Sequence, residues 1–256
     1  MNKLNDDYIA TKFIVLGSLV DRAVSMPFTK PTILNSSGKT IRGKLKEETR
    51  ISSEINESAG LIHNVLEFLH EESKHVGSPC KEDRCDEARY LVDPAGYWWS
   101  ALLDDFLSLE ICLDSRPACS KQKPCDRHWV LDRLKPTTKT AAREIEKEAA
   151  HQEWTWLWSQ PSLVKTVAGL PKITRPDLIA GISGSGCIVF DLKTTKNIDE
   201  YYESKEKYED QKETFSDWRK LLKGQALVSN QSCALVVSSV NERAVWFDFD
   251  RINESR

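Results

Sequence analysis

The stretch that decides the fold is TRPDLIAGISGSGCIVFDLKTT, residues 174–195. Its two apolar runs, LIAGIS and CIVFDLKTT, are short, rich in strand-forming residues and separated by Gly-Ser-Gly, which predicts a β-hairpin. Charged residues stand at the ends of these runs, at Asp177, Asp191 and Lys193. Because burying a charge without a partner costs free energy, this placement predicts an ion pair, a bound metal ion or a catalytic role.

Pairing of the two predicted strands brings the three charged groups together. With the turn centred on Ser185, Asp177 is expected opposite Lys193, and Asp191 lies two residues before Lys193. Side chains alternate between faces along a strand, so Asp191 and Lys193 point the same way. Cross-strand neighbours lie about 5 Å apart and diagonal ones within about 8 Å, so all three groups are expected to converge.

Two carboxylates this close repel each other unless a cation lies between them. A hard divalent cation, Mg²⁺ or Mn²⁺, would take oxygen ligands from Asp177, Asp191 and the backbone carbonyl of Leu192. Such an ion lowers the pKa of a bound water and polarises a phosphodiester, and Lys193 could stabilise the developing charge or orient the water. The alternative on spacing alone is an Asp–Lys salt bridge with the second aspartate capping the strand.

The order Pro176-Asp177, thirteen intervening residues, then Asp191-Leu192-Lys193 resembles the PD-(D/E)XK nuclease motif. The continuation Lys193-Thr194-Thr195 is similar to the corresponding strand in the RecB-like branch that includes phage lambda exonuclease and RecE. This resemblance implies a restriction-endonuclease-like fold and metal-dependent hydrolysis of DNA. It also implies that Asp177, Asp191 and Lys193 are catalytic.

Two further elements extend the resemblance. Gly60-x-x-His63, on a predicted helix, is loosely similar to the family's G-x-x-x-H element, with two intervening residues instead of three. The resemblance implies that His63 binds or orients the metal ion. The alternative is a histidine at the margin of an apolar helix stripe. Gln225 in LLKGQALVSN resembles the family's Q-x-x-x-Y element at the scissile region, although Ser229 stands where tyrosine is expected and Gln211 is a competing choice.

Composition limits the class of protein. The chain has 256 residues, 40% of them hydrophobic, with eight tryptophans, which predicts a sizeable core. Its net charge of −3 argues against indiscriminate nucleic-acid binding. No apolar run reaches the roughly 18 residues of a membrane helix, and we identify no signal peptide. We therefore expect no membrane partner and an intracellular protein, cytoplasmic or, in a eukaryote, nuclear or organellar.

Basic residues gather in one segment. Between Arg116 and Arg143 there are eight Lys or Arg and two acids. We expect residues 115–138 to be rich in loops. The basic segment 116–143 is expected to follow DNA phosphates, with Trp129 stacking on an unpaired base. The alternative is a solvated basic face whose tryptophan belongs to the core. The residues proposed to bind nucleic acid are Lys121, Lys123, Arg127 and Arg133.

Seven cysteines in a chain without an identified signal peptide are expected to be reduced thiols or metal ligands. The pairs Cys80-x4-Cys85 and Cys119-x5-Cys125, with Cys112 and His128 nearby, could form a structural site for zinc or an iron–sulfur cluster. Neither spacing is the tight C-x2-C. Cys187 and Cys233 stand on predicted strands and are expected to be core thiols.

The predicted architecture is an α/β (α+β) fold, with a restriction-endonuclease-like mixed sheet flanked by helices and a helical N-terminal elaboration. Helices are expected from about residue 47, over 96–113 and over 139–158, and the last strands are CALVVSS and AVWFDFD. We expect a single nuclease domain over 1–256, with a helical and basic insertion at 76–158 and the catalytic sheet at 170–250.

The function we expect from the resemblance is that of a magnesium-dependent deoxyribonuclease. It would act as an exonuclease on DNA ends, in recombination, in repair or within a mobile element. A sequence-specific restriction endonuclease is the nearest enzymatic alternative. A non-catalytic nucleic-acid-binding module is the alternative from another class.

Overall fold

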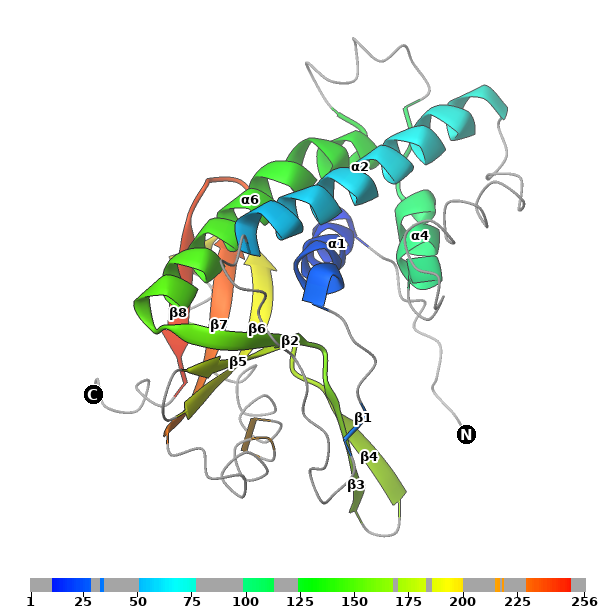
Figure 1. Cartoon of the computed structure of the whole chain (residues 1–256). Coiled ribbons are helices and arrows are strands. Elements are labelled where there is room, and N and C mark those ends of the chain that lie inside the picture. The colour runs from blue at the N-terminus through cyan, green and yellow to red at the C-terminus, as the bar shows by residue number, and fades with distance from the viewer. Residues whose placement is uncertain are drawn as a thin grey trace.

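The computed structural model describes residues 11–28, 33–34, 51–76, 99–112, 124–167, 170–182, 186–199, 215–216, 218 and 229–249. Apart from the two-residue strand β1, helices come first among the described elements and strands last, as the sequence predicts (Figure 1). The helical elements are α1 (Lys12–Ser25), the short 3₁₀ helix η1 (Met26–Phe28), α2 (Ile51–Val76), α4 (Trp99–Ser108) and α6 (Asp126–His151). The strands are β1 (Ile33–Leu34), β2 (Trp154–Ser159), β3 (Ser162–Val167), β4 (Leu170–Thr174), β5 (Leu178–Ile182), β6 (Gly186–Thr195), β7 (Ser229–Ser238) and β8 (Ala244–Asp248).

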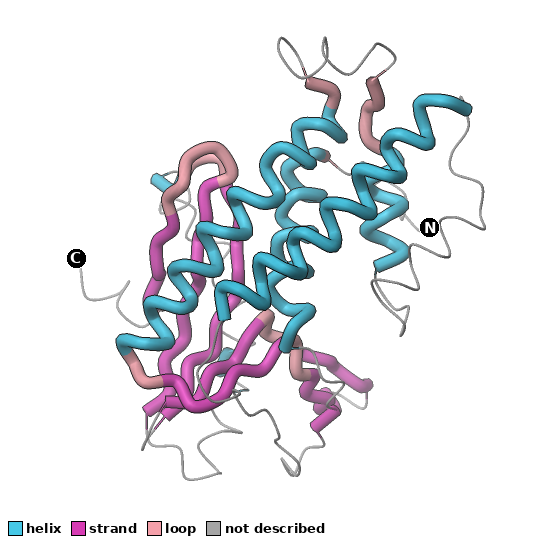
Figure 2. The backbone as a smooth tube through the Cα atoms, turned by 45° about the horizontal axis from the view of Figure 1, so that its top comes forward, coloured by secondary structure: helices cyan, strands magenta, loops and turns pink. Residues whose placement is uncertain are grey.

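The main sheet has five strands in the order β2-β5-β6-β7-β8. Strands β6 and β7 pair in parallel, and the other neighbours pair antiparallel. A second sheet, β1-β3-β4, projects away from the main one (Figures 1 and 2). The expected mixed sheet flanked by helices is therefore confirmed, as are the two predicted strand pairs β5–β6 and β7–β8.

The predicted register of the β5–β6 hairpin is wrong by two residues. The observed pairs run from Leu178 opposite Phe190 to Ile182 opposite Gly186. The connection is thus residues 183–185, centred on Gly184 rather than Ser185, and extending the ladder by one pair places Asp177 opposite Asp191. Because the error is an even number of residues, every side chain keeps its predicted face.

Alternation along β6 divides the core into two parts. Ile188, Phe190 and Leu192 belong to the larger cluster, which includes the buried faces of α1, α2, α4 and α6. Cys187 and Val189 belong to a smaller cluster on the other face, with Trp218. Figure 2 shows the long helices packed together on one side of the main sheet. Helix α2 buries the predicted stripe, namely Ile51, Ile55, Ala59, Ile62, Leu66 and Leu69.

The expectation of loops over 115–138 is wrong for its described C-terminal part, because α6 is continuous from Asp126 and contains Pro136. Proline lacks the N–H of an interior helix bond and usually kinks or ends a helix. Here the buried face of α6, including Val130, Leu134 and Ile145, packs in the larger core cluster and offsets that cost.

The aromatic run WTWLWS was expected to end a helix, but it forms strand β2. The helix ends at His151, and Glu153 adopts a positive φ of 52°, which turns the chain before Trp154. Alternating tryptophans fit a strand as well as a helix end, and pairing with β5 decides between them.

Helix α1 approaches β6 closely at Gly17, where an added Cβ would lie 2.5 Å from Thr194 Oγ1. We expect Gly17→Ala to lower the free energy of unfolding by about 1–3 kcal/mol, because the helix must move away from the strand. The matched control is Gly60→Ala on α2, where no heavy atom lies within 4 Å of the added Cβ. That change should raise stability by up to about 1 kcal/mol, since alanine favours the helix.

Urea unfolding of both variants measures this difference. Replacing Thr194 with alanine in the Gly17→Ala background should recover most of the loss, because it removes the opposing oxygen. An equal rise in the free energy of unfolding for Gly17→Ala and Gly60→Ala would show that α1 does not pack tightly on β6.

Candidate active site

The structure brings Asp177, Asp191 and Lys193 together, as the sequence predicts. Lys193 Nζ lies 3.0 Å from Asp191 Oδ2. The Asp177 N–H donates to Asp191 Oδ1 at 3.4 Å, and the Leu192 N–H donates to Asp177 Oδ2 at 2.7 Å. These groups therefore meet just before the start of β5, where β6 continues beyond its partner.

The backbone of Leu192 also faces this site. In a β-strand the N–H and C=O of one residue point to the same side. Because the Leu192 N–H points to Asp177, its carbonyl points to the same edge of β6. The β5–β6 ladder ends with the pair Leu178–Phe190, so no β5 residue pairs with Leu192. The carbonyl therefore lies on the side of β6 where the proposed ion would bind.

A third carboxylate, which the sequence reasoning missed, comes from Asp21 on α1. Its Oδ2 accepts a hydrogen bond from Gln160 Nε2 at 3.1 Å. Its Oδ1 is buried and receives no hydrogen bond from the described residues. Gln160 also donates its backbone N–H to the Asp177 carbonyl at 2.7 Å, and its φ is +47°. Gln160 thus links the acid on α1 to Asp177, the residue that precedes β5.

The electrostatics of the site reflect this crowding of acids. Burial raises the pKa of Asp177 well above its usual range, and the neighbouring Asp21 and Asp191 add to the rise. Burial likewise raises the pKa of Asp21 to about 7; the charge of Lys193 lowers that pKa and the charge of Asp191 raises it. Burial lowers the pKa of Lys193, but Asp191 and Asp177 outweigh it and leave that pKa raised. One ammonium therefore does not compensate the three carboxylates.

Asp21 left a weak signal in the sequence. Asp21 and Arg22 are adjacent charges inside the apolar run of α1, between the buried Val20 and Ala23. Two charged residues in an apolar helical run indicate that a polar group on another helix, strand or loop contacts them. Nothing in the sequence tells which element that is, since Gln160 is 139 residues away.

The remaining residues suggested by the family resemblance are not brought to this site in the described contacts. His63 Nδ1 lies 3.9 Å from Glu67 Oε2 on its own helix. Burial lowers the pKa of His63, and the charged groups acting on it are Lys135, Glu67 and Asp132, none of them a site acid. Gln225 and Gln211 lie outside the described residues.

The nucleic-acid-binding role predicted for Arg127 is wrong. Its side chain is buried and donates to the carbonyls of Leu107 and Leu109, so it cannot reach a phosphate. Burial lowers the pKa of Arg127 to about 10, with Cys125 acting in the opposite direction. These contacts support a structural role, in which Arg127 links α6 to the end of α4.

Trp129 belongs to the core, which confirms the alternative reading of that residue. It is buried, and Arg133 lies over its ring at 4.6 Å. Lys121 and Lys123 lie outside the described residues. An exposed basic row does occur on α6, where Lys135, Lys139 and Arg143 line a hollow of about 470 Å³.

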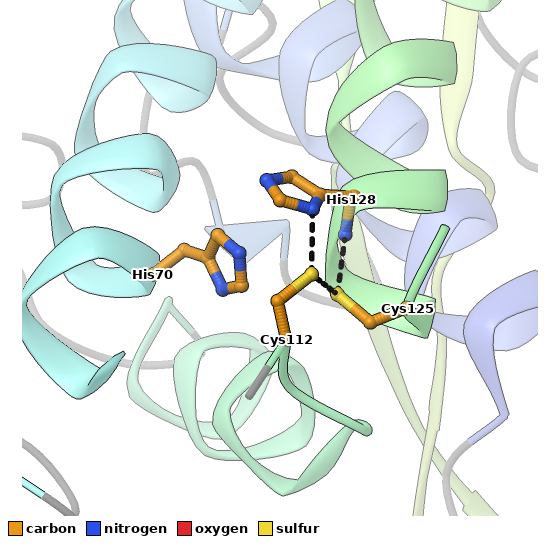
Figure 3. A group of neighbouring side chains, drawn as sticks. All are labelled: His70, Cys112, Cys125 and His128. Atoms are coloured by element: carbon orange, nitrogen blue, oxygen red, sulfur yellow. Dashed lines mark hydrogen bonds between the residues drawn. The ribbon is translucent and has the colours of Figure 1, made fainter. Parts of the chain in front are cut away.

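The cysteine predictions are met in part. The expectation of reduced thiols is wrong for Cys112, which is disulfide-bonded, whereas Cys125, Cys187 and Cys233 are in no disulfide. Cys112, Cys125 and His128 lie together with His70, and all four are buried (Figure 3). Their ligand atoms lie within 4.8 Å of one another, so the group could hold a metal ion. Cys80, Cys85 and Cys119 lie outside the described residues. Cys187 and Cys233 are buried on β6 and β7, as expected for core thiols.

No helix in the described part of the chain is long and apolar enough to cross a membrane. No family model matches the sequence, and neither the curated proteins nor the solved structures give a match. The PD-(D/E)XK resemblance, with the fold and activity that it implies, therefore stands as a proposal that rests on the residues of the site.

Proposed function

We propose that the protein is a metal-dependent deoxyribonuclease with a restriction-endonuclease-like core. The observation that carries the proposal is the meeting of Asp177, Asp191 and Lys193 at one edge of β6, with contacts of 2.7–3.4 Å. Asp21, reaching the same place from α1, adds a third carboxylate. Separate elements that converge on an excess of buried negative charge are typical of a cation-binding catalytic centre.

The residues present fit a hard divalent cation. Three carboxylates and one ammonium leave two negative charges when all are ionised, which one Mg²⁺ or Mn²⁺ would balance. Asp177, Asp191 and the Leu192 carbonyl would hold the ion, and the buried Oδ1 of Asp21 offers a further oxygen. Bound there, the ion would supply a water of lowered pKa and polarise the phosphodiester. Lys193 would orient that water or stabilise the developing charge.

The family resemblance favours an exonuclease that acts on DNA ends, in recombination, in repair or within a mobile element. A restriction endonuclease would use the same metal-binding groups and the same lysine, Lys193. For His63 and Gln225, the resemblance is the sole support for a role at this site.

A non-catalytic binding module is the second candidate, favoured by the 3.0 Å ion pair between Lys193 and Asp191. That pair accounts for one carboxylate. It leaves the half-buried carboxylates of Asp177 and Asp21 without a salt bridge to any described residue, while the same Lys193 ammonium acts on all three acids. That is a costly arrangement for a purely structural element.

The test is digestion of purified protein with linear and circular duplex DNA, with Mg²⁺ added or omitted. Loss of linear DNA alone, and only with Mg²⁺, is the result expected of an exonuclease. Discrete fragments from both substrates would indicate a restriction endonuclease. Intact DNA in every reaction, together with a Mg²⁺-independent gel shift, would reject catalysis in favour of the binding module.

A further inference from the structure

Four metal-ligating side chains lie together away from the proposed active site. His70 comes from α2, Cys112 follows α4, and Cys125 and His128 stand at the start of α6 (Figure 3). Cys112 Sγ lies 2.9 Å from His128 Nδ1 and 3.1 Å from Cys125 Sγ. The rings of His70 and His128 meet edge to face, with centroids 4.3 Å apart.

The surrounding chain holds these side chains in place. Cys125 is the N-cap of α6, and its sulfur accepts the His128 N–H at 3.4 Å. Cys125 thus occupies the position where the first N–H groups of α6 point. Arg127 in turn fixes the segment that leads to Cys112, through the carbonyls of Leu107 and Leu109 and through its own N–H to Glu110 O at 3.3 Å.

We propose that His70, Cys112, Cys125 and His128 bind one Zn²⁺ ion, which ties α2 and the segment after α4 to the first turn of α6. The ion is structural, because four protein ligands complete a tetrahedral shell and leave no position for substrate.

The geometry favours a single ion over an iron–sulfur cluster. Tetrahedral Zn²⁺, with Zn–S near 2.3 Å and Zn–N near 2.0–2.1 Å, holds its ligand atoms about 3.3–3.8 Å apart. The donors here lie within 4.8 Å of one another, so movements of under about 1.5 Å close the shell. A cluster would place two or more irons between the same ligands and force them apart. Two thiolates and two imidazoles in tetrahedral order suit zinc among the common metals.

The oxidation state of Cys112 decides whether the ion can bind. The structure assigns Cys112 to a disulfide, whereas Cys125 is not in one. A disulfide sulfur is not a thiolate, so the proposed site exists in the protein with Cys112 reduced. Oxidation of Cys112 and zinc binding are therefore mutually exclusive.

Metal analysis of the full chain, purified under reducing conditions without chelator, tests the proposal. We expect about one zinc per chain, and Co²⁺ replacement should give tetrahedral visible bands with thiolate charge transfer in the near ultraviolet. Removal of zinc should lower Tm by about 10 °C, and Zn²⁺ but not Mg²⁺ should restore it. Reduced protein that neither contains nor takes up zinc, or that carries several irons per chain, would overturn the proposal.

Variants assign the ligands. Cys125→Ser and His70→Ala should each weaken zinc binding at least about 100-fold, while Cys233→Ser and His151→Ala, a buried thiol and an exposed histidine elsewhere, should retain zinc. Because a ligand variant can fail to fold, the Tm shift of the unaltered chain on zinc removal is an independent measure. Thiol mapping that finds Cys112 still disulfide-bonded in the reduced protein would also overturn the site.

Discussion

Lys193→Ala removes Mg²⁺-dependent DNA cleavage, with an expected fall in single-turnover rate of about 10²–10³-fold. The ammonium is the one cation in contact with Asp191, at 3.0 Å, among the described residues. No other described cation occupies its place, so the developing negative charge of the transition state loses its partner. Asp177→Asn should have an effect of similar size or larger, because it removes an oxygen that holds the ion.

Matched controls separate catalysis from folding. Lys196→Ala and Asp199→Asn change the same residue types a few positions along the chain, where both side chains are exposed. Both should cleave end-labelled duplex DNA at the unaltered rate. Circular dichroism and Tm report whether each variant is folded. Folded Lys193→Ala and Asp177→Asn proteins that cleave within about three-fold of the unaltered chain would show that these charges only form an ion pair.

Asp21→Asn is expected to make the Mg²⁺-free protein more stable at pH 8 by about 2–4 kcal/mol. Burial raises the pKa of Asp21 to about 7 from an ordinary value of 3.8. Between these values the unfolded chain is ionised there and the folded chain is not, so the folded state holds the extra proton. Stability therefore falls as pH rises through this window, and Asp177, whose pKa is also raised, acts in the same direction. The raised pKa of Lys193 acts only at higher pH.

Urea unfolding at pH 4.5 and pH 8, without Mg²⁺, measures the effect. The unaltered chain should lose stability between the two values, and Asp21→Asn should lose much less. Added Mg²⁺ should stabilise the unaltered chain at pH 8 and should stabilise Asp21→Asn less. Asp199→Asn serves as the exposed-acid control and should follow the unaltered chain. If Asp21→Asn has a lower free energy of unfolding than the unaltered chain at both pH values, the ionised carboxylate stabilises the fold.

The sequence predicted the parts of the site that depend on local pairing. Asp177, Asp191 and Lys193 lie on one hairpin, so strand alternation alone brings them together despite a register error of two residues. Asp21 could not be placed in this way, because its contact with Gln160 depends on how α1 packs on the sheet. His70 was missed for the same reason, since it reaches Cys112 from a different helix.

The errors in secondary structure have a common physical origin. The sequence predicts loops over 115–138, yet the packing of α6 against α1 and α2 overrides the local preference at Pro136. The WTWLWS run was treated as a helix end, yet pairing with β5 makes it a strand. In both places tertiary contacts outweigh a local signal that is weak or ambiguous. The β5–β6 hairpin was predicted correctly apart from its register, because its local signals and its long-range role agree.

The hydrogen bond between Gln160 and Asp21 on α1 has a consequence for synthesis of the chain. Asp21 is synthesised 139 residues before Gln160, which at 5–20 residues per second corresponds to roughly 7–28 s. Throughout that interval the Asp21 carboxylate remains hydrated, because Gln160 and the acids of the hairpin have not yet been made, so the nascent chain has no assembled site. The site is thus completed late in translation, once the β5–β6 hairpin that follows Gln160 has been made.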